Sequence, residues 1–210
     1  MNVTLLHHTP LEVCAHAIRT CWQSFDKSDE GGEKDRALID RVGNKYKHAS
    51  TLEHLVYTFY IQGVSRALLQ ELARHRMASL SVKSTRYTLK ELKESEPFDE
   101  EDFEGASRFI VLTHHEEVDR ASIRALNNLQ SLLRQGVGND YAKFALPECY
   151  KTELTWTVNA RSLQNFLALR SNKSALWEIR KLAYTLYDHL PEDHRYLFRE
   201  SLYQEEPAGE

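Results

Sequence analysis

The chain is poor in cysteine, glycine and proline, and these shortages narrow what it can be. Among 210 residues there are 3 Cys, 8 Gly and 5 Pro. The odd number of cysteines and the lack of a C-x-x-C pair argue against a disulfide framework and indicate a reducing cytoplasm. No H-E-x-x-H motif and no Cys/His cluster with zinc spacing is present, so we expect no metal site.

Long apolar runs and a strong excess of one charge are also missing. No stretch approaches the roughly 18 apolar residues of a membrane-spanning helix, and the first residues do not read as a secretory signal. The formal net charge of −4 makes the chain a poor candidate for binding bulk nucleic acid. We therefore expect a soluble, cytoplasmic globular protein without membrane or nucleic-acid partners.

Strand-like and helical patterns are mixed along the chain, without repeats or a clear linker. They predict an α/β (α+β) fold with a central twisted sheet flanked by helices, in a single domain over residues 1–210 that ends in a disordered tail, 204–210. Aromatic and β-branched runs predict strands at residues 2–8, 55–61 and 152–158. Apolar spacing predicts helices at residues 11–25, 34–46, 107–135, 160–170 and 174–189, another leading into Arg74, and a short last one opened by Pro191.

The cysteines themselves show no sign of chemistry. Cys14 and Cys21 would share a helical face with Ile18 and Trp22, so we expect both in the core. No sequence feature marks Cys149 as an activated nucleophile.

The most informative stretch is the basic, hydroxyl-rich block of residues 74–87, RHRMASLSVKSTRY. Guanidinium forks match phosphate oxygens, and the hydroxyls add further donors and acceptors. Arg74, His75 and Arg76 are consecutive, so on a helix they would point about 100° apart. We expect the helix to end here and the triplet to fan out around a large anionic ligand. The plainer alternative is that these cations only stabilise the end of a helix.

The block closely resembles the signature of the flavin-dependent thymidylate synthases, RHR followed some residues later by S-x-R-Y. Further matches extend the resemblance over most of the chain. It implies a mixed α/β fold that assembles as a homotetramer with active sites at subunit junctions. It also implies conversion of dUMP to dTMP, with carbon from methylenetetrahydrofolate and hydride from FAD that NADPH has reduced; tetrahydrofolate leaves as the folate product.

The resemblance assigns roles within the block. It implies that Arg74 and Arg86, with the hydroxyls of Ser84 and Thr85, hold the dUMP phosphate and ribose, and that Glu71 also lies at this substrate. It implies cofactor contacts for four residues: Arg74, His75, Arg76 and Val82. Ser84 is then a binding group, because no His and Asp spacing marks it as the nucleophile of a triad.

A second polar cluster, residues 48–54 (HASTLEH), precedes the central strand. One interpretation is a polar turn in which Glu53 and His54 pair with the backbone. The resemblance implies instead that Ser50 touches the flavin nucleotide and that His48 lines the active site.

A third cluster, residues 159–170 (NARSLQNFLALR), spans a strand-to-helix junction. Asn159 alone would read as an N-cap. Arg161 and Asn165 share a helix face, whereas Arg170 lies about 180° from Arg161, so the two arginines should serve different groups. The resemblance implies that Asn159, Ala160, Arg161 and Asn165 contact FAD. It implies that Arg170 contacts the uracil ring and stabilises negative charge on it.

Several positions depart from the family pattern. Lys143 occurs where the family usually carries Arg; the resemblance places it near the nucleotide, without a bidentate fork, although it could equally be a solvated lysine. The other departures are Glu71 in place of Gln, Val82 in place of Glu or Gln, Thr85 in place of Gly or Gln, and Ser174 in place of a His that can contact flavin.

Two other functions compete with this interpretation. A non-catalytic nucleotide- or RNA-binding module would need aromatic residues among the charges for base stacking, and the block has only Tyr87. An enzyme that uses flavin for a different nucleotide reduction is disfavoured only by the resemblance.

Overall fold

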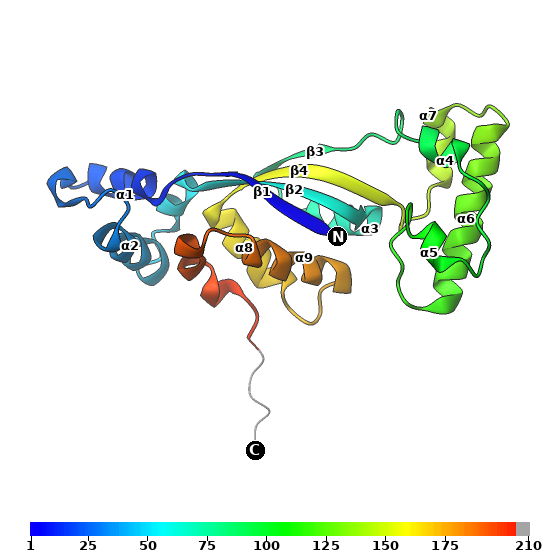
Figure 1. Cartoon of the computed structure of the whole chain (residues 1–210). Helices are drawn as coiled ribbons and strands as arrows, with labels where there is room; N and C mark the ends of the chain where they lie inside the picture. The colour runs from blue at the N-terminus through cyan, green and yellow to red at the C-terminus, as the bar shows by residue number, and fades with distance from the viewer. Residues whose placement is uncertain (205–210) are drawn as a thin grey trace, which may run out of the picture. The chain divides into compact units, whose positions relative to one another are not determined.

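A four-stranded antiparallel sheet with strand order β1-β2-β4-β3 organises the protein. The structure is a computed structural model and describes residues 1–204 (Figure 1). The strands are β1 Asn2–His8, β2 Val56–Ser65, β3 Ala78–Val82 and β4 Lys151–Asn159. The mixed α/β class and the three predicted strands are confirmed, whereas β3, inside the basic block, was not predicted. Of the predicted tail, only Gln204 lies within the described residues.

The chain divides into two compact units. The first unit comprises Met1–Ile61, Leu72–Leu80 and the chain from Thr155 onward, and the second comprises Gln62–Glu71 and Ser81–Leu154. The boundaries fall within strands β2, β3 and β4 and before the last residue of helix α3, Arg66–Leu72. The single domain over the whole chain stays a prediction. No helix of the described chain is both long and apolar enough to cross a lipid bilayer.

The first unit carries most of the short helical segments. Its α-helices are α1 Leu11–Thr20, α2 Glu33–Ile39, α8 Ala160–Arg170 and α9 Trp177–Asp188. A π-helix, Asp40–Lys45, continues α2, and 3-10 helices occupy Phe25–Lys27, Ala49–His54, Glu192–Leu197 and Arg199–Ser201. The prediction for α8 is confirmed at both ends, and the short helix opened by Pro191 is confirmed as a 3-10 helix.

Aromatic side chains fill the core of the first unit. Alternation along the strands turns Tyr57, Phe59 and Trp156 toward the same buried side, because successive side chains of a strand point to opposite faces. The Trp156 ring lies 6.4 Å from Phe59 and 5.1 Å from Phe166 of α8, measured between centroids. Complete burial of such a side chain contributes about 1.5–3 kcal/mol, which anchors α8 against the sheet.

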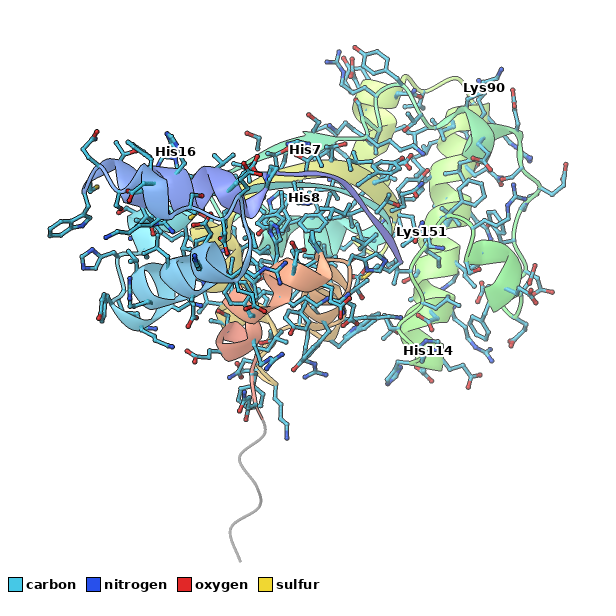
Figure 2. All side chains as sticks on the ribbon, turned by 60° about the vertical axis from the view of Figure 1, so that its left-hand side comes forward. His7, His8, His16, Lys90, His114 and Lys151 are labelled. Carbon is cyan, nitrogen blue, oxygen red and sulfur yellow. The ribbon has the colours of Figure 1, made fainter. Side chains whose placement is uncertain are left out.

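The second unit is built around one long helix. Its helices are α3 Arg66–Leu72, whose last residue belongs to the first unit, α4 Lys90–Glu94, α5 Phe103–Ala106, α6 Glu116–Arg134 and α7 Asn139–Ala142, followed by the 3-10 helix Lys143–Ala145. One buried apolar cluster holds it together: Leu89, Leu92, Ala106, Phe109, Ile110, Ile123, Leu126, Leu129, Leu133, Ala142 and Tyr150. Lys151, which Figure 2 labels, is partly buried. Its ammonium donates to the Ser107 carbonyl in this unit.

The predicted start of the long helix was wrong. It begins at Glu116 rather than at residue 107, because the segment before it pairs elsewhere: Ile110 forms an antiparallel bridge with Tyr150. The buried Asp119 carboxylate then accepts from the backbone N–H groups of Thr113 and His114, at 2.8 and 3.0 Å, and fixes the turn. The predicted C-terminus is confirmed by Gly136, which has a φ of 88°.

The N-terminal helix was also predicted too long. It ends at Thr20, and Gln23 adopts a φ of 50°, so the apolar face does not continue. Cys14 is buried as predicted, but Cys21 is exposed and Trp22 is 84% exposed. The prediction that both cysteines lie in the core was therefore wrong for Cys21.

Candidate active site

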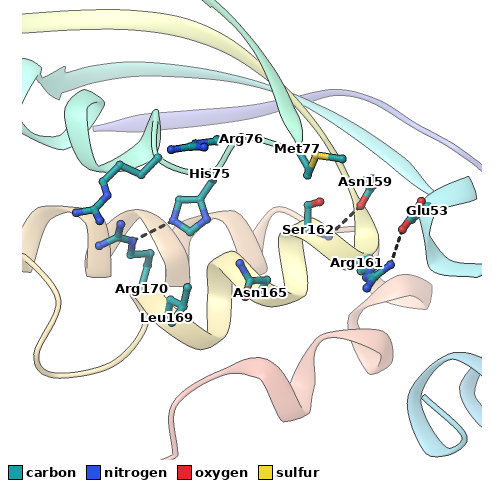
Figure 3. Close-up of a pocket in the computed structure, with 11 residues that line it drawn as sticks. Glu53, His75, Arg76, Met77, Asn159, Arg161, Ser162, Asn165, Leu169 and Arg170 are labelled. Carbon is teal, nitrogen blue, oxygen red and sulfur yellow. Dashed lines mark hydrogen bonds and ion pairs between the residues drawn. The ribbon is translucent and has the colours of Figure 1, made fainter. Parts of the chain in front are cut away.

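A pocket of about 770 Å³ opens in the first unit where β4 runs into α8 (Figure 3). It is lined by residues from three separate segments of the chain: Glu53, Arg74, His75, Arg76, Met77, Asn159, Arg161, Ser162, Asn165, Leu169 and Arg170. Six of these were predicted from the sequence as cofactor contacts and Arg170 as a catalytic residue. The pocket thus brings together residues from all three sequence clusters, although Glu53 is its only residue from the cluster at 48–54.

Asn159 marks the change from strand to helix. Its backbone is extended, with φ −83° and ψ 163°, and its Oδ1 accepts from the backbone N–H of Ser162 at 2.9 Å. The N-cap interpretation is therefore confirmed. Ala160 is fully buried, and its N–H donates to the Leu55 carbonyl at 2.8 Å, so it does not line the pocket.

The Arg-His-Arg triplet leaves its helix as predicted. Helix α3 ends at Leu72, whose carbonyl accepts from the His75 N–H at 3.0 Å. All three side chains then reach the pocket. Neither Arg74 nor Arg76 forms an ion pair with a carboxylate in the part of the chain that the structure describes. Two guanidinium groups without internal counter-charges make this wall of the pocket suited to an anionic ligand.

The two arginines of α8 have different partners. Arg161 Nη1 lies 2.7 Å from Oε1 of Glu53, which belongs to the 3-10 helix before β2. Arg170 Nε donates to Nε2 of His75 at 3.0 Å. These different partners agree with the positions of the two arginines around the helix, and both line the same pocket. Which ligand group each arginine serves stays a prediction. The sequence had not predicted the pairing role of Glu53.

Known proteins resemble this chain over nearly its whole length. The family described as "Thymidylate synthase complementing protein" matches residues 4–194. A flavin-dependent thymidylate synthase from Wolinella succinogenes is 73% identical over 198 residues, which are 94% of this chain and 97% of that protein. One from Campylobacter jejuni is 65% identical, covering 98% and 99% of the two chains.

The solved structures that resemble this chain are of the same kind of enzyme as the relatives found by sequence. A crystal structure of thymidylate synthase X from Helicobacter pylori, with FAD and dUMP, has a TM-score of 0.92 at 55% identity and covers 97% of this chain and all of that one. This chain belongs to the flavin-dependent thymidylate synthase family. The family signature read from residues 74–87 was therefore interpreted correctly.

The remaining signature residues of this synthase lie in the second unit. Arg86 Nε is 2.5 Å from Oδ1 of Asp140, and the Asn139 side chain donates to the Arg86 carbonyl at 2.7 Å. Arg86, Asn139 and Asp140 line a smaller hollow of about 300 Å³, together with Tyr87 and Tyr141. An arginine predicted to bind phosphate is therefore paired with a carboxylate.

Other predicted contacts differ in exposure. Ser84 is exposed, Thr85 is buried, and Lys143 and Glu71 are half-buried, all in the second unit. Val82, at the end of β3, is 39% exposed. Their contacts with dUMP or cofactor stay predictions.

His48 and Ser50 are exposed residues of the first unit. They lie on the turn that supplies Glu53 to the pocket but do not line it themselves. Their roles in this synthase also stay predictions. The sequence missed four lining residues: Glu53, Met77, Ser162 and Leu169. Met77, Ser162 and Leu169 each follow or precede a predicted residue, and Glu53 lies three residues after Ser50. Only the fold turns these four residues toward the pocket.

Proposed function

We propose that this protein converts dUMP to dTMP, with FAD as its bound cofactor and methylenetetrahydrofolate and NADPH as co-substrates. The observation that carries the proposal is the convergence of Arg74, Arg76, Arg161 and Arg170 with Asn165 on one pocket. The curated relatives are named flavin-dependent thymidylate synthases, and the Helicobacter pylori structures contain FAD and dUMP.

The residues of the pocket fit a flavin dinucleotide. Its volume of about 770 Å³ lies in the range of small-molecule sites. The guanidinium groups of Arg74 and Arg76, which form no ion pair with a carboxylate of the described chain, suit the diphosphate of FAD. The side chains of Asn165 and Arg161 supply further hydrogen bonds. Once bound and reduced by NADPH, FAD supplies the hydride for the reaction. Of the residues proposed to hold FAD, six line the pocket: Arg74, His75, Arg76, Asn159, Arg161 and Asn165. Ser50, Val82 and Ala160 do not line it, and their proposed contacts rest on the family resemblance alone.

The other polar residues predicted from the sequence are proposed to bind the substrate, dUMP. Arg86, Ser84 and Thr85 bind the dUMP phosphate and ribose, and Arg74, Glu71 and Lys143 contact the same nucleotide. Arg170 lies at the uracil and stabilises the negative charge that develops when the ring nitrogen loses its proton. A charge fixed in place before the reaction is among the largest catalytic contributions an enzyme can make. His48 is proposed for the reacting end of the site on the family resemblance alone, because it does not line the pocket itself.

The assembly we propose is a homotetramer with active sites shared between subunits, in the cytoplasm. Its support is the family resemblance together with two large side chains left open to solvent in the second unit. Tyr141 is 78% and Phe144 is 88% exposed, on either side of Lys143. Exposed aromatic residues are enriched at subunit contacts, so these side chains are candidates for burial beside the proposed nucleotide contact.

The decisive test is the visible spectrum of the purified protein. We expect flavin bands that bleach when NADPH is added anaerobically, and faster when dUMP is present. Arg76→Ala should lose most of the flavin, whereas Arg108→Ala, which removes an arginine outside the pocket, should keep it. A colourless protein that also fails to bind added FAD would contradict the proposal. Retention of the colour by Arg76→Ala would contradict the assignment of the pocket.

A further inference from the structure

We infer that His75 is a positioning residue for Arg170: its imidazole accepts a hydrogen bond that fixes the guanidinium at the uracil. This inference rests on the proposed function, because it assumes that Arg170 acts on dUMP. It adds a second task to a residue that the family signature assigns to the flavin.

The direction of the hydrogen bond follows from chemistry. Arg170 Nε lies 3.0 Å from His75 Nε2 (Figure 3). A guanidinium has five donors and no acceptor, so Nε2 must present its lone pair. His75 is therefore neutral in this contact and carries its proton on Nδ1. An imidazolium would turn an N–H toward a cation and could not hold Arg170 in this position.

The imidazole is itself held in place. Its ring lies edge-on to Phe166, with centroids 5.0 Å apart and planes at 71°. Phe166 is fully buried and packs on Trp156 at 5.1 Å. Phe166 and Arg170 are four residues apart on α8 and so share one face of the helix, across which His75 lies.

The backbone fixes the other end of His75. Its N–H donates to the Leu72 carbonyl at 3.0 Å, which ties the residue to the end of α3. The side chain of Arg170 is long and flexible, whereas His75 is fixed by its backbone and by a buried ring. The fixed imidazole of His75 therefore determines the orientation of the Arg170 guanidinium.

Positioning of this kind should appear in kcat rather than in substrate affinity. Misplacement of a catalytic group by about 1 Å can cost 10²-fold in rate. Glutamine carries an acceptor oxygen near the position of Nε2, whereas asparagine places its oxygen near that of Nδ1, which does not face Arg170. His75→Gln and His75→Asn are thus a matched pair that differs in where the acceptor lies.

The test uses the full-length protein loaded with FAD and saturated with dUMP. We expect His75→Asn to lower kcat by about 10- to 100-fold and His75→Gln to recover most of that loss, with KM for dUMP little changed in both. Equal kcat for the two variants would overturn the inference, because a structural role or a flavin contact does not distinguish them in this way.

A double-mutant cycle gives an independent test. In an Arg170→Ala background the hydrogen bond between His75 and Arg170 is already absent, so His75→Asn should change kcat by less than about twofold. Independent, multiplying effects would overturn the inference. The proposed function fails in a different way: wild-type protein would form no dTMP, or Arg170→Ala alone would leave turnover intact.

Discussion

The Arg86 guanidinium is paired with the Asp140 carboxylate, with Nε 2.5 Å from Oδ1, although both side chains are more than half exposed. The pair links residues 54 positions apart, and both residues line the hollow of about 300 Å³ together with Tyr87. If Arg86 binds the dUMP phosphate, as proposed, the Asp140 carboxylate must compete with that phosphate for the N–H groups of the Arg86 guanidinium.

Asp140→Asn should therefore bind dUMP more tightly. An exposed ion pair contributes about 0.2–1 kcal/mol, so releasing it should lower the dissociation constant by up to about fivefold. Titration calorimetry at low salt measures the change. Glu91→Gln is the matched control, because it removes an exposed carboxylate from a pair with Arg108 in the same unit. Weaker binding by Asp140→Asn would mean that the carboxylate orients Arg86 for the phosphate.

A buried ion pair should control the stability of the first unit. Asp35 is fully buried and accepts from Arg19 Nε and Nη2 at 3.1 and 2.6 Å, from the Ser28 hydroxyl at 2.7 Å and from the Gly31 N–H at 3.0 Å. Burial opposes the ionisation of Asp35, but these hydrogen bonds and the charge of Arg19 outweigh it and lower the pKa of the carboxyl.

Asp35→Asn should lower the free energy of unfolding by about 3–5 kcal/mol, because it leaves the charge of Arg19 buried and unpaired. Chemical denaturation at neutral pH measures the loss. Asp40→Asn breaks a pair with Lys45 that is mostly solvent-exposed on the lysine side, and it should cost less than about 1 kcal/mol. Similar losses for the two variants would contradict this account of the buried pair.

Mild acid should weaken the fold through His194. Burial lowers the pKa of this histidine to about 4, and its Nδ1 lies 2.7 Å from the Tyr57 hydroxyl. In the unfolded chain it titrates near 6.5. The unfolded state therefore binds one more proton as the pH falls below about 6.5, and stability falls until the pH reaches about 4.

The loss from this group should reach about 3 kcal/mol at pH 4. His194→Gln should flatten the stability between pH 6.5 and 4, measured as the free energy of urea unfolding. His7 is exposed, so His7→Gln serves as the control and should leave the pH dependence unchanged (Figure 2). An unaltered slope in His194→Gln would assign the acid sensitivity to other groups.

The sequence correctly predicted the secondary-structure elements whose ends are determined by residues close to them in the chain. Helix α8 begins after an N-capping Asn159 and ends at Arg170, as its sequence indicates, and the Arg-His-Arg triplet leaves its helix. Strand β3 was missed because serines alternate along its five residues, ASLSV, and only pairing with β4 makes it a strand.

Long-range pairs could not be predicted. Arg170 and His75 are 95 residues apart, and Arg161 and Glu53 are 108 residues apart. Each pair exists because β4 and α8 bring distant segments to one pocket. The same holds for the start of α6, where Asp119 holds a turn against the helical pattern of residues 107–115. The sequence thus predicted seven of the eleven residues that line the pocket, and the fold determined their partners.

The two arginines of α8, Arg161 and Arg170, are proposed to bind different ligands, and this gives the most specific functional prediction. Arg170, held by His75, is proposed to act on the uracil, whereas Arg161, held by Glu53, is proposed to hold FAD. Arg170→Ala should therefore lower kcat by at least about 10²-fold, because the removed charge acts in the transition state, while most of the flavin stays bound.

Arg161→Ala should show the opposite pattern. It should release flavin on gel filtration and recover much of its turnover when FAD is added in excess, because it loses binding rather than catalysis. Flavin absorbance per polypeptide and kcat at saturating dUMP and FAD separate the two effects. Both arginines lie on one helix and line one pocket, so a general disturbance of α8 would reduce both quantities in both variants. Parallel losses of that kind would contradict separate roles, whereas a crossed pattern would assign one end of the pocket to the substrate and the other to the cofactor.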